Sequence, residues 1–367
     1  MLPGFVDTHR HVWQSALRSA APDVDLGGYL GLILGQFAPR FRPPDVYAAT
    51  LAGALELLDF GITTVMDFSQ VVHTPDHADA AVDALQAAGL RAVFGYGFPF
   101  TGGGDADDVR RVRADRLAED TALVTMALAP VGPAFTPIEQ VTADWRLAAD
   151  LDLPITFHVA SGPAAARPVS VLREHGLLRS NILYVHGNSL DEGELKLIAE
   201  SGGTASVAPA GEAQMGSGAP VAGRLRQAGV TTGLGVDSVA SIPGDMFSLM
   251  RAALLASQIA GDPRFTVRDV LRMATVDGAA ALGLADRIGS LRPGKQADVI
   301  LLRLNDLNML TAERDPITAV VTAANPANVD TVLVAGQIVK TGGRLVRGDL
   351  AEAAQAVRAT AAAVNGR

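Results

Sequence analysis

Eight short apolar runs, each followed by a longer stretch of helical character, constrain the fold of this chain more than any other feature. The expected strands are residues 3–7, 63–67, 91–96, 122–128, 155–159, 182–186, 205–208 and 231–235. The expected helices include residues 44–58, 76–88, 137–151 and 191–200. Regular alternation of strands and helices is typical of α/β proteins with a parallel sheet. Eight such units favour a closed (β/α)8 TIM-type barrel over a doubly wound open sheet, which is the alternative.

The pattern changes after about residue 286, where strands and turns replace the strand–helix alternation. The strands expected there are residues 288–302, 331–334 and 337–340, and the alanine-rich stretch 350–364 is expected to form a helix. We therefore expect a barrel over residues 1–286. A small β-rich appendage with a C-terminal helix should follow over residues 287–367.

Composition excludes several classes of function and partner. The net charge of -9 argues against nucleic acid or an anionic membrane as a partner, and the absence of cysteine excludes disulfides, thiolate metal sites and Cys nucleophiles. The longest apolar run, residues 26–38, is too short and too interrupted for a membrane span, and no signal peptide is recognisable. We expect a cytoplasmic protein that acts on a small molecule. A homo-oligomer is compatible with the sheet edge that the appendage would leave exposed.

Histidines gather at the ends of the expected strands. His9 and His11 follow the first strand with alternate spacing, so both side chains point to the same side. His158 and His186 end the fifth and sixth strands, and Asp237 follows the eighth. The carboxyl ends of barrel strands meet on one face, where active sites are built. Imidazole and carboxylate groups that meet there are suitable ligands for a divalent metal.

Several motifs in this order resemble the amidohydrolase superfamily, close to the branch of cytosine deaminase, 8-oxoguanine deaminase and the triazine hydrolases. These motifs are PGFVDTHRHVWQ at 3–14, GITTVMD at 61–67, His158, YVH at 184–186, LGVDS at 234–238 and GSLRPGKQADV at 289–299. The resemblance covers nearly the whole chain. It implies a metal-dependent hydrolase built on the barrel predicted above.

The resemblance also bears on the number of metal ions, because two-metal members bridge their ions with a carbamylated lysine from the fourth strand. The three lysines of this chain, Lys196, Lys295 and Lys340, lie outside every expected barrel strand. We therefore expect one divalent metal ion, with the ligands His9, His11, His158 and Asp237. Zinc is the expected ion, and iron is an alternative because imidazole suits both.

The expected reaction is hydrolysis of a C–N or similar bond in a small cyclic or aromatic nitrogen compound. The metal lowers the pKa of its bound water, Asp237 takes the proton, and hydroxide attacks an sp² carbon. His186 is expected to hydrogen-bond the water or to hold the developing charge. The residues expected to contact the substrate are Trp13, Gln14, His73 and Glu212.

One position departs from the pattern of the deaminase branch. There, a glutamate that shuttles protons follows the fifth-strand histidine by three residues, whereas this chain has Ser161. The pKa of a serine hydroxyl is too high for that role. We therefore do not expect useful deamination of cytosine, guanine or 8-oxoguanine, unless Glu212 replaces the missing acid. A non-hydrolytic lyase, isomerase or cyclase with the same metal site is the alternative, and an inactive binding protein is a third possibility.

Overall fold

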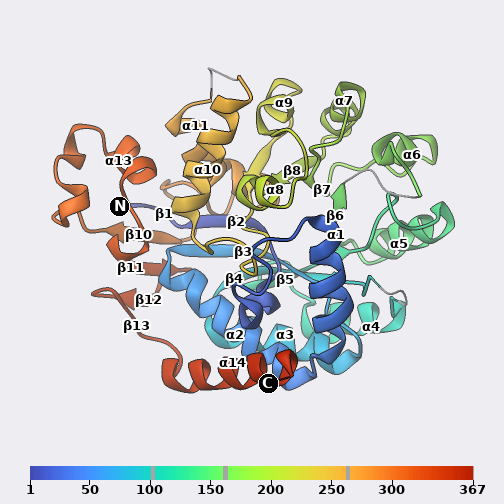
Figure 1. Ribbon diagram of the computed structural model, residues 1–367, viewed down its shortest axis with the longest axis horizontal. Helices are drawn as coiled ribbons and strands as arrows, with labels where there is room; N and C mark the ends of the chain where they lie inside the picture. Colours follow the sequence, from blue (N-terminus) through green and yellow to red (C-terminus); the bar gives the residue numbers. More distant parts are fainter. Residues whose placement is uncertain (101–103, 160–163, 262–264, 367) are drawn as a thin grey trace.

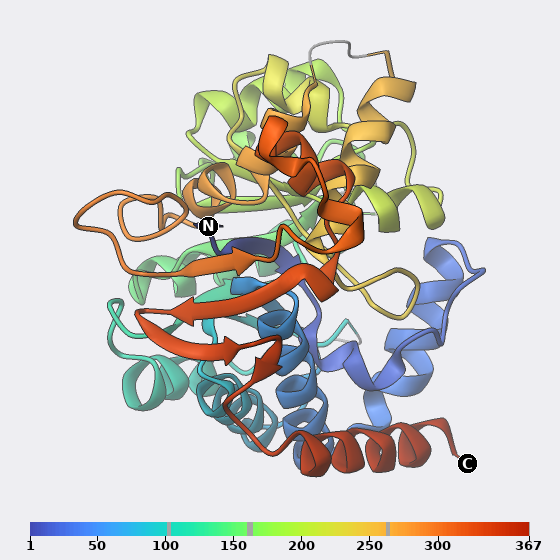
Figure 2. The same ribbon diagram turned by 90° about the vertical axis from the view of Figure 1, so that its left-hand side faces the viewer.

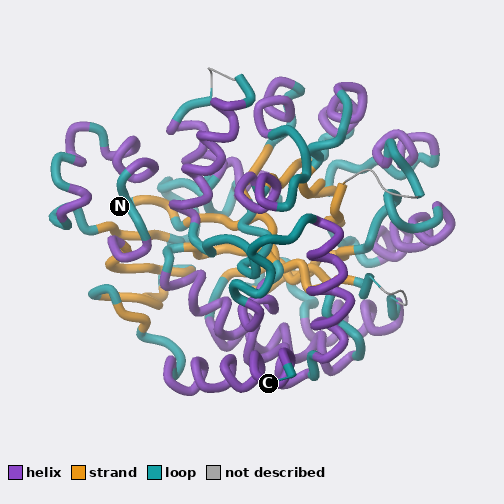
Figure 3. Tube along the Cα trace, viewed as in Figure 1, coloured by secondary structure: helices purple, strands orange, loops and turns teal. Residues whose placement is uncertain are grey.

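The computed structural model describes residues 1–100, 104–159, 164–261 and 265–366. Eight parallel strands form one sheet in sequence order, from β2 to β9 (Figures 1 and 3). They are β2 (Phe5–Arg10), β3 (Ile62–Ser69), β4 (Arg91–Gly97), β5 (Val124–Ala129), β6 (Ile155–Val159), β7 (Ile182–His186), β8 (Thr204–Val207) and β9 (Thr232–Leu234). An isolated parallel bridge between Arg10 and Asp237 joins the first strand to the end of the last. The predicted (β/α)8 TIM-type barrel is thus confirmed.

Helices surround this sheet and cover its outer side (Figure 3). They are α2 (Pro43–Asp59), α3 (Pro75–Ala88), α4 (Ala106–Arg111), α5 (Ile138–Asp150), α6 (Pro168–Glu174), α7 (Glu192–Glu200), α8 (Pro209–Gln214), α9 (Ala222–Gln227), α10 (Met246–Ile259), α11 (Val267–Met273) and α12 (Val276–Ala281). Both faces of the strands are buried, which explains why the strands read as continuous apolar runs. Within the described ranges, no helix is long and apolar enough to cross a membrane.

The segment between β2 and α2 contains short helices that periodicity did not predict. It comprises the 3₁₀ helix η1 (Val12–Leu17), α1 (Leu26–Tyr29), the π-helix η2 (Leu30–Phe37) and the 3₁₀ helix η3 (Ala38–Arg40). The apolar run at 26–38, noted above for its length, forms most of this segment. This segment lies beside the carboxyl ends of the barrel strands and contributes side chains to the cavity there.

A second, antiparallel sheet lies beside the barrel and combines both ends of the chain (Figure 2). Its order is β1 (Leu2–Pro3), β10 (Val299–Leu302), β11 (Val329–Val334), β12 (Gln337–Thr341) and β13 (Arg344–Leu345). The expected strand at 3–7 is therefore two strands in different sheets, separated by Gly4. A Cβ at Gly4 would lie 2.1 Å from Thr63 Oγ1, so only glycine fits where the chain passes from one sheet to the other.

Two further helices follow the barrel. The predicted C-terminal helix is confirmed as α14 (Leu350–Asn365), which lies against α2 at the foot of Figure 1. Arg40 Nη1 donates to the carbonyl of Val364 (2.8 Å), and Thr360 Oγ1 donates to Asp45 (3.2 Å). The short helix α13 (Pro316–Thr322) packs on α10 and α11 and was not predicted.

Candidate metal centre

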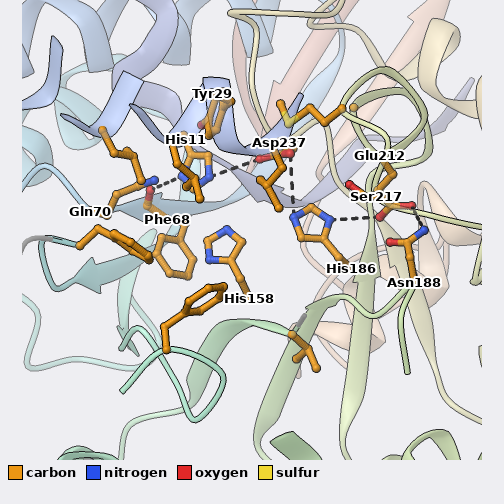
Figure 4. Close-up of a pocket in the computed structure, with 18 of the residues that line it drawn as sticks. His11, Tyr29, Phe68, Gln70, His158, His186, Asn188, Glu212, Ser217 and Asp237 are labelled. Carbon is orange, nitrogen blue, oxygen red and sulfur yellow. Dashed lines mark hydrogen bonds and ion pairs between the residues drawn. The ribbon is translucent and has the colours of Figure 1, made fainter. Parts of the chain in front are cut away.

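Four imidazoles and one carboxylate meet at the carboxyl ends of the barrel strands, as predicted, and Figure 4 labels all of them except His9. His9 lies in β2 and His11 follows its last residue, His158 lies in β6, His186 ends β7, and Asp237 follows β9. Asp237 Oδ1 lies 3.3 Å from the Nε2 atoms of both His9 and His11, and its Oδ2 lies 4.0 Å from His186 Nε2.

The possible ligand atoms fall into two groups that share His9. One group is His9, His11 and His158, and the other is His9, His186 and Asp237, and the ligand atoms within each lie within 4.8 Å of one another. The predicted ligand set draws on both groups. His186 lies close enough to the centre to contact a bound ion or its water.

Backbone strain accompanies two residues of the centre. His186 (φ 71°) and Asp237 (φ 69°) adopt the left-handed conformation, which costs a non-glycine residue about 1–3 kcal/mol. Asp237 is held there by two backbone hydrogen bonds, from its N–H to the His9 carbonyl (2.8 Å) and from the His11 N–H to its own carbonyl (2.9 Å). Closure of the barrel therefore brings the carboxylate to the two histidines at the end of β2.

The charge states at this centre suit a divalent cation. Burial lowers the pKa of His9 to about 4, although the hydrogen bond with Asp237 opposes this, and burial with neighbouring imidazoles holds the pKa of His158 well below its usual value. Burial alone would raise the pKa of Asp237, but the imidazoles of His11 and His9, each 3.3 Å from its Oδ1, hold it well below its usual value. Neutral imidazoles around an ionised carboxylate are the forms in which these groups bind metals.

The hydrogen bonds of the imidazoles also fit a bound cation. Among the described residues, the buried Nε2 of His9 has only the 3.3 Å contact with Asp237 Oδ1 and no well-formed hydrogen bond, so a cation would supply the partner it lacks. His11 donates from Nδ1 to the Phe68 carbonyl (2.8 Å), which leaves Nε2 free to face the centre. Lys196 lies in α7, Lys295 in a turn and Lys340 in β12, so no barrel strand carries a lysine that could bridge two ions.

Glu212 and His186 form a pair at the edge of the centre. Glu212 lies in the first turn of α8, and its Oε1 is 3.1 Å from His186 Nδ1. Burial lowers the pKa of His186, but the hydrogen bond that the ring donates to Glu212 and the charge of Asp237 outweigh it and raise the pKa above its usual value. The predicted site residue Glu212 is thus in contact with the predicted catalytic histidine.

A cavity of about 300 Å³ opens above these residues. Apolar and aromatic side chains form most of its wall: Leu26, Tyr29, Leu30, Leu34, Phe68, Phe98, Phe100, Val131, Phe135, Val159 and Met215. Its polar wall includes Gln70, Asn188, Ser189, Ser217 and Glu212. Among the described residues that line it, none is lysine or arginine, and the only carboxylates are Asp237 and Glu212.

Three residues that were predicted to contact the substrate lie away from this wall: Trp13, Gln14 and His73. The chain enters η1 directly after His11, which turns Trp13 into the core, where it packs on Phe41 and donates to Gln70 Oε1 (3.2 Å). Gln14 is buried behind Tyr29, to whose hydroxyl it donates (2.7 Å). His73 donates a hydrogen bond from Nε2 to the Ala38 carbonyl (3.1 Å) and does not line the cavity.

Most of the apolar wall of the cavity was not predicted from the sequence. Leu26, Tyr29, Leu30 and Leu34 recur at helical spacing within the apolar run at 26–38, which was the signal available for a helix that covers the strand ends. Ser161, the position that departs from the deaminase pattern, lies outside the described residues.

A TIM-type barrel with a histidine–aspartate centre at its carboxyl end defines a metal-dependent hydrolase of the amidohydrolase type. The amidohydrolase family matches residues 1–339, so the chain belongs to this family.

Relatives of known activity cover most of the chain. It is 32% identical over 354 residues to a 5-methylthioadenosine/S-adenosylhomocysteine deaminase of Pelotomaculum thermopropionicum, with 92% of this chain and 80% of the relative covered. It is 31% identical over 365 residues to a 5′-deoxyadenosine deaminase of Methanothermobacter thermautotrophicus, with 94% and 83% covered.

Solved structures of similar fold are also deaminases and hydrolases. An adenosine deaminase from Xanthomonas campestris with bound zinc superimposes with a TM-score of 0.88 at 27% identity, covering 100% of this chain and 86% of the other. Atrazine chlorohydrolase from Arthrobacter aurescens complexed with zinc gives a TM-score of 0.84 at 25% identity, covering 98% and 88%. The predicted family and the hydrolytic class are therefore confirmed. The lyase, isomerase or cyclase alternative is not favoured, because these proteins are deaminases and hydrolases.

Proposed function

We propose that this protein is a mononuclear metal-dependent hydrolase that cleaves a C–N bond on the ring of a small, uncharged nitrogen heterocycle. The observation that carries the proposal is the convergence of His9, His11, His158 and Asp237 at the floor of a mainly apolar cavity. We propose zinc as the ion, since three imidazoles and one carboxylate suit it and two structural neighbours hold it.

The roles of the side chains follow from their positions. When bound, the metal supplies a Lewis acid that lowers the pKa of a water molecule at the centre. Asp237 is ionised and takes the proton from the attacking water, while His186 lies beside it and stabilises charge that develops on the ring. Phe68, whose ring is 4.5 Å from that of His158, excludes bulk water from one side of the centre.

The wall of the cavity favours a neutral substrate with an apolar substituent. With no lysine or arginine among its described lining residues, a charged group would be transferred from water without a counter-ion, which is costly. The name of the relative from Pelotomaculum thermopropionicum includes nucleosides with two kinds of arm, an apolar methylthio group and a charged homocysteine group. We propose that this chain prefers the apolar arm.

An isotope experiment with matched substrates tests the function. Zinc-loaded protein is incubated in ¹⁸O-water with 5-methylthioadenosine, S-adenosylhomocysteine or guanine. Mass spectrometry then measures the rate of conversion and the incorporation of ¹⁸O into each product. We expect conversion of 5-methylthioadenosine with one solvent oxygen in the product, at least about tenfold faster than that of S-adenosylhomocysteine. Guanine, which has no apolar arm to contact the wall of the cavity, should react more slowly. A product without solvent oxygen, or no conversion by protein that holds its ion, would contradict the proposal.

A further inference from the structure

Glu212 is a second buried carboxylate at the centre, and neither group of possible metal ligands includes it. It is 4% exposed and lies on α8, whereas the expected position of the proton-shuttling glutamate, 161, is a serine. A buried carboxylate is costly unless it is hydrogen-bonded, so its partners indicate its role.

Three donors hold the two oxygens of Glu212. Oε1 accepts from the backbone N–H of Ala208 (2.7 Å) and lies 3.1 Å from His186 Nδ1, and Oε2 accepts from Asn188 Nδ2 (3.2 Å). Asn188 is itself fixed by a second hydrogen bond to the Ala219 carbonyl (3.0 Å). The carboxylate is thus held in one orientation, with His186 between it and Asp237 (Figure 4).

The same geometry determines which nitrogen of His186 faces the centre. An ionised carboxylate accepts and does not donate, so the hydrogen bond to Glu212 requires the proton of His186 on Nδ1. Nε2, which lies 4.0 Å from Asp237 Oδ2, is then the nitrogen directed at the reacting groups. The ring also stacks on His158, with centroids 5.5 Å apart, which limits its rotation.

We propose that Glu212 is a positioning residue that keeps His186 protonated on Nδ1 and presents Nε2 to the reacting centre. Its importance for turnover rests on the proposed function, whereas the protonation pattern does not. Direct proton transfer by Glu212 fits the structure less well, because both oxygens are occupied and His186 separates it from Asp237. Glu212 thus influences the reacting groups through the orientation and protonation of His186.

The test compares Glu212→Gln with a matched control, Glu194→Gln. Glu194 is also buried, but it accepts from the backbone N–H groups of Val169 and Ser170 (both 2.8 Å) at the start of α6, outside the centre. Zinc-loaded proteins labelled with ¹⁵N in histidine give side-chain NMR spectra that identify the protonated nitrogen, and His186→Asn assigns the signal. We expect His186 to carry its proton on Nδ1 in the parent and in Glu194→Gln, and to lose this preference in Glu212→Gln.

Two NMR results would overturn the proposal: a parent in which His186 is protonated on Nε2, or a Glu212→Gln spectrum that is unchanged. The first needs no variant, so the test stands even where Glu212→Gln does not fold. These spectra need no substrate, so failure of the proposed function is recognised separately, by zinc-loaded parent protein that converts no compound.

Kinetics on 5-methylthioadenosine then separate positioning from structural support. We expect kcat of Glu212→Gln to fall about 10- to 100-fold at nearly constant KM and metal content, as for other residues that orient a group at a metal site. Glu194→Gln should keep its kcat. A rise in KM with unchanged kcat would assign Glu212 to substrate binding and contradict a positioning role.

Discussion

At the scale of single residues, the centre works by keeping several imidazoles neutral in a small volume. The rings of His9 and His158 have centroids 4.9 Å apart, so adding a proton to each would place like charges side by side in a buried site. Asp237 alone supplies negative charge among the four proposed ligands. Binding of one divalent ion by neutral imidazoles and the Asp237 carboxylate is therefore more favourable than protonation of several imidazoles.

The two overlapping ligand groups lead to a prediction on metal content. His158→Ala should reduce the bound metal far below the level of about one ion per chain expected for the parent, because a direct ligand is lost. His186→Ala should keep its metal and lose about 10²- to 10⁴-fold in turnover. Elemental analysis of protein purified without chelator measures the first effect. Loss of metal from His186→Ala would instead assign the ion to His9, His186 and Asp237.

The placement of the five metal-centre residues could be predicted from sequence because it depends on local rules. Strand alternation places His9 and His11 together, and the parallel barrel brings His158, His186 and Asp237 to the same face. The substrate wall could not be predicted in this way. It depends on how irregular helices pack over the strand ends, which turned Trp13 into the core.

At the scale of elements, the regular strands and long helices match the sequence pattern closely. The expected helix at 44–58 is Pro43–Asp59, and the expected strand at 155–159 is Ile155–Val159. Short elements such as η1 and η2 were not predicted, because tertiary packing rather than a repeated apolar pattern stabilises them.

Helix α5 contains a buried carboxylate whose stability effect depends on pH. Burial raises the pKa of Asp144 to about 6, although the hydrogen bond from Gln140 (2.7 Å) opposes this. The folded state therefore holds a proton that the unfolded state releases near its ordinary pKa of 3.8. The contribution of protonated Asp144 to the free energy of unfolding is fully present below pH 3.8, and it is lost as the pH rises through about 6.

Asp144→Asn should thus stabilise the protein at pH 8 and leave its stability nearly unchanged at pH 4. The amide keeps an acceptor for Gln140 and removes the buried charge, for an expected gain of about 1–3 kcal/mol at the higher pH. Urea unfolding of both proteins at the two pH values measures the difference. An equal effect at both pH values would show that the carboxylate does not titrate as stated.

At the scale of the whole molecule, the two ends of the chain complete one sheet beside the barrel. β1 pairs with β10, and the break between β1 and β2 at Gly4 was not visible in the sequence, because residues 3–7 read as one strand. Such pairing is decided by contacts almost 300 residues apart, beyond the reach of local pattern. The expected cytoplasmic location and homo-oligomer stay predictions.

A buried ion pair joins the terminal sheet to the barrel at the end opposite the metal centre. Arg91, the first residue of β4, donates from Nε to Asp298 Oδ2 (2.7 Å) and from Nη2 to Oδ1 (2.9 Å). Both side chains are at most 3% exposed. Asp298 also accepts from the N–H of Ala335 (2.8 Å), beside β11. Three parts of the chain thus depend on one carboxylate.

Arg91→Met should therefore destabilise the whole molecule by about 3–5 kcal/mol, because it removes the cation that is hydrogen-bonded to both oxygens of the buried Asp298 carboxylate. Adding Asp298→Asn removes that charge and keeps an acceptor for Ala335, so the double variant should recover at least half of the loss. Urea midpoints measure both effects, and metal content should stay at the parent level because the pair is remote from the centre. A double variant less stable than Arg91→Met would show that the charge of Asp298 is satisfied without Arg91, and that the loss arises from packing alone.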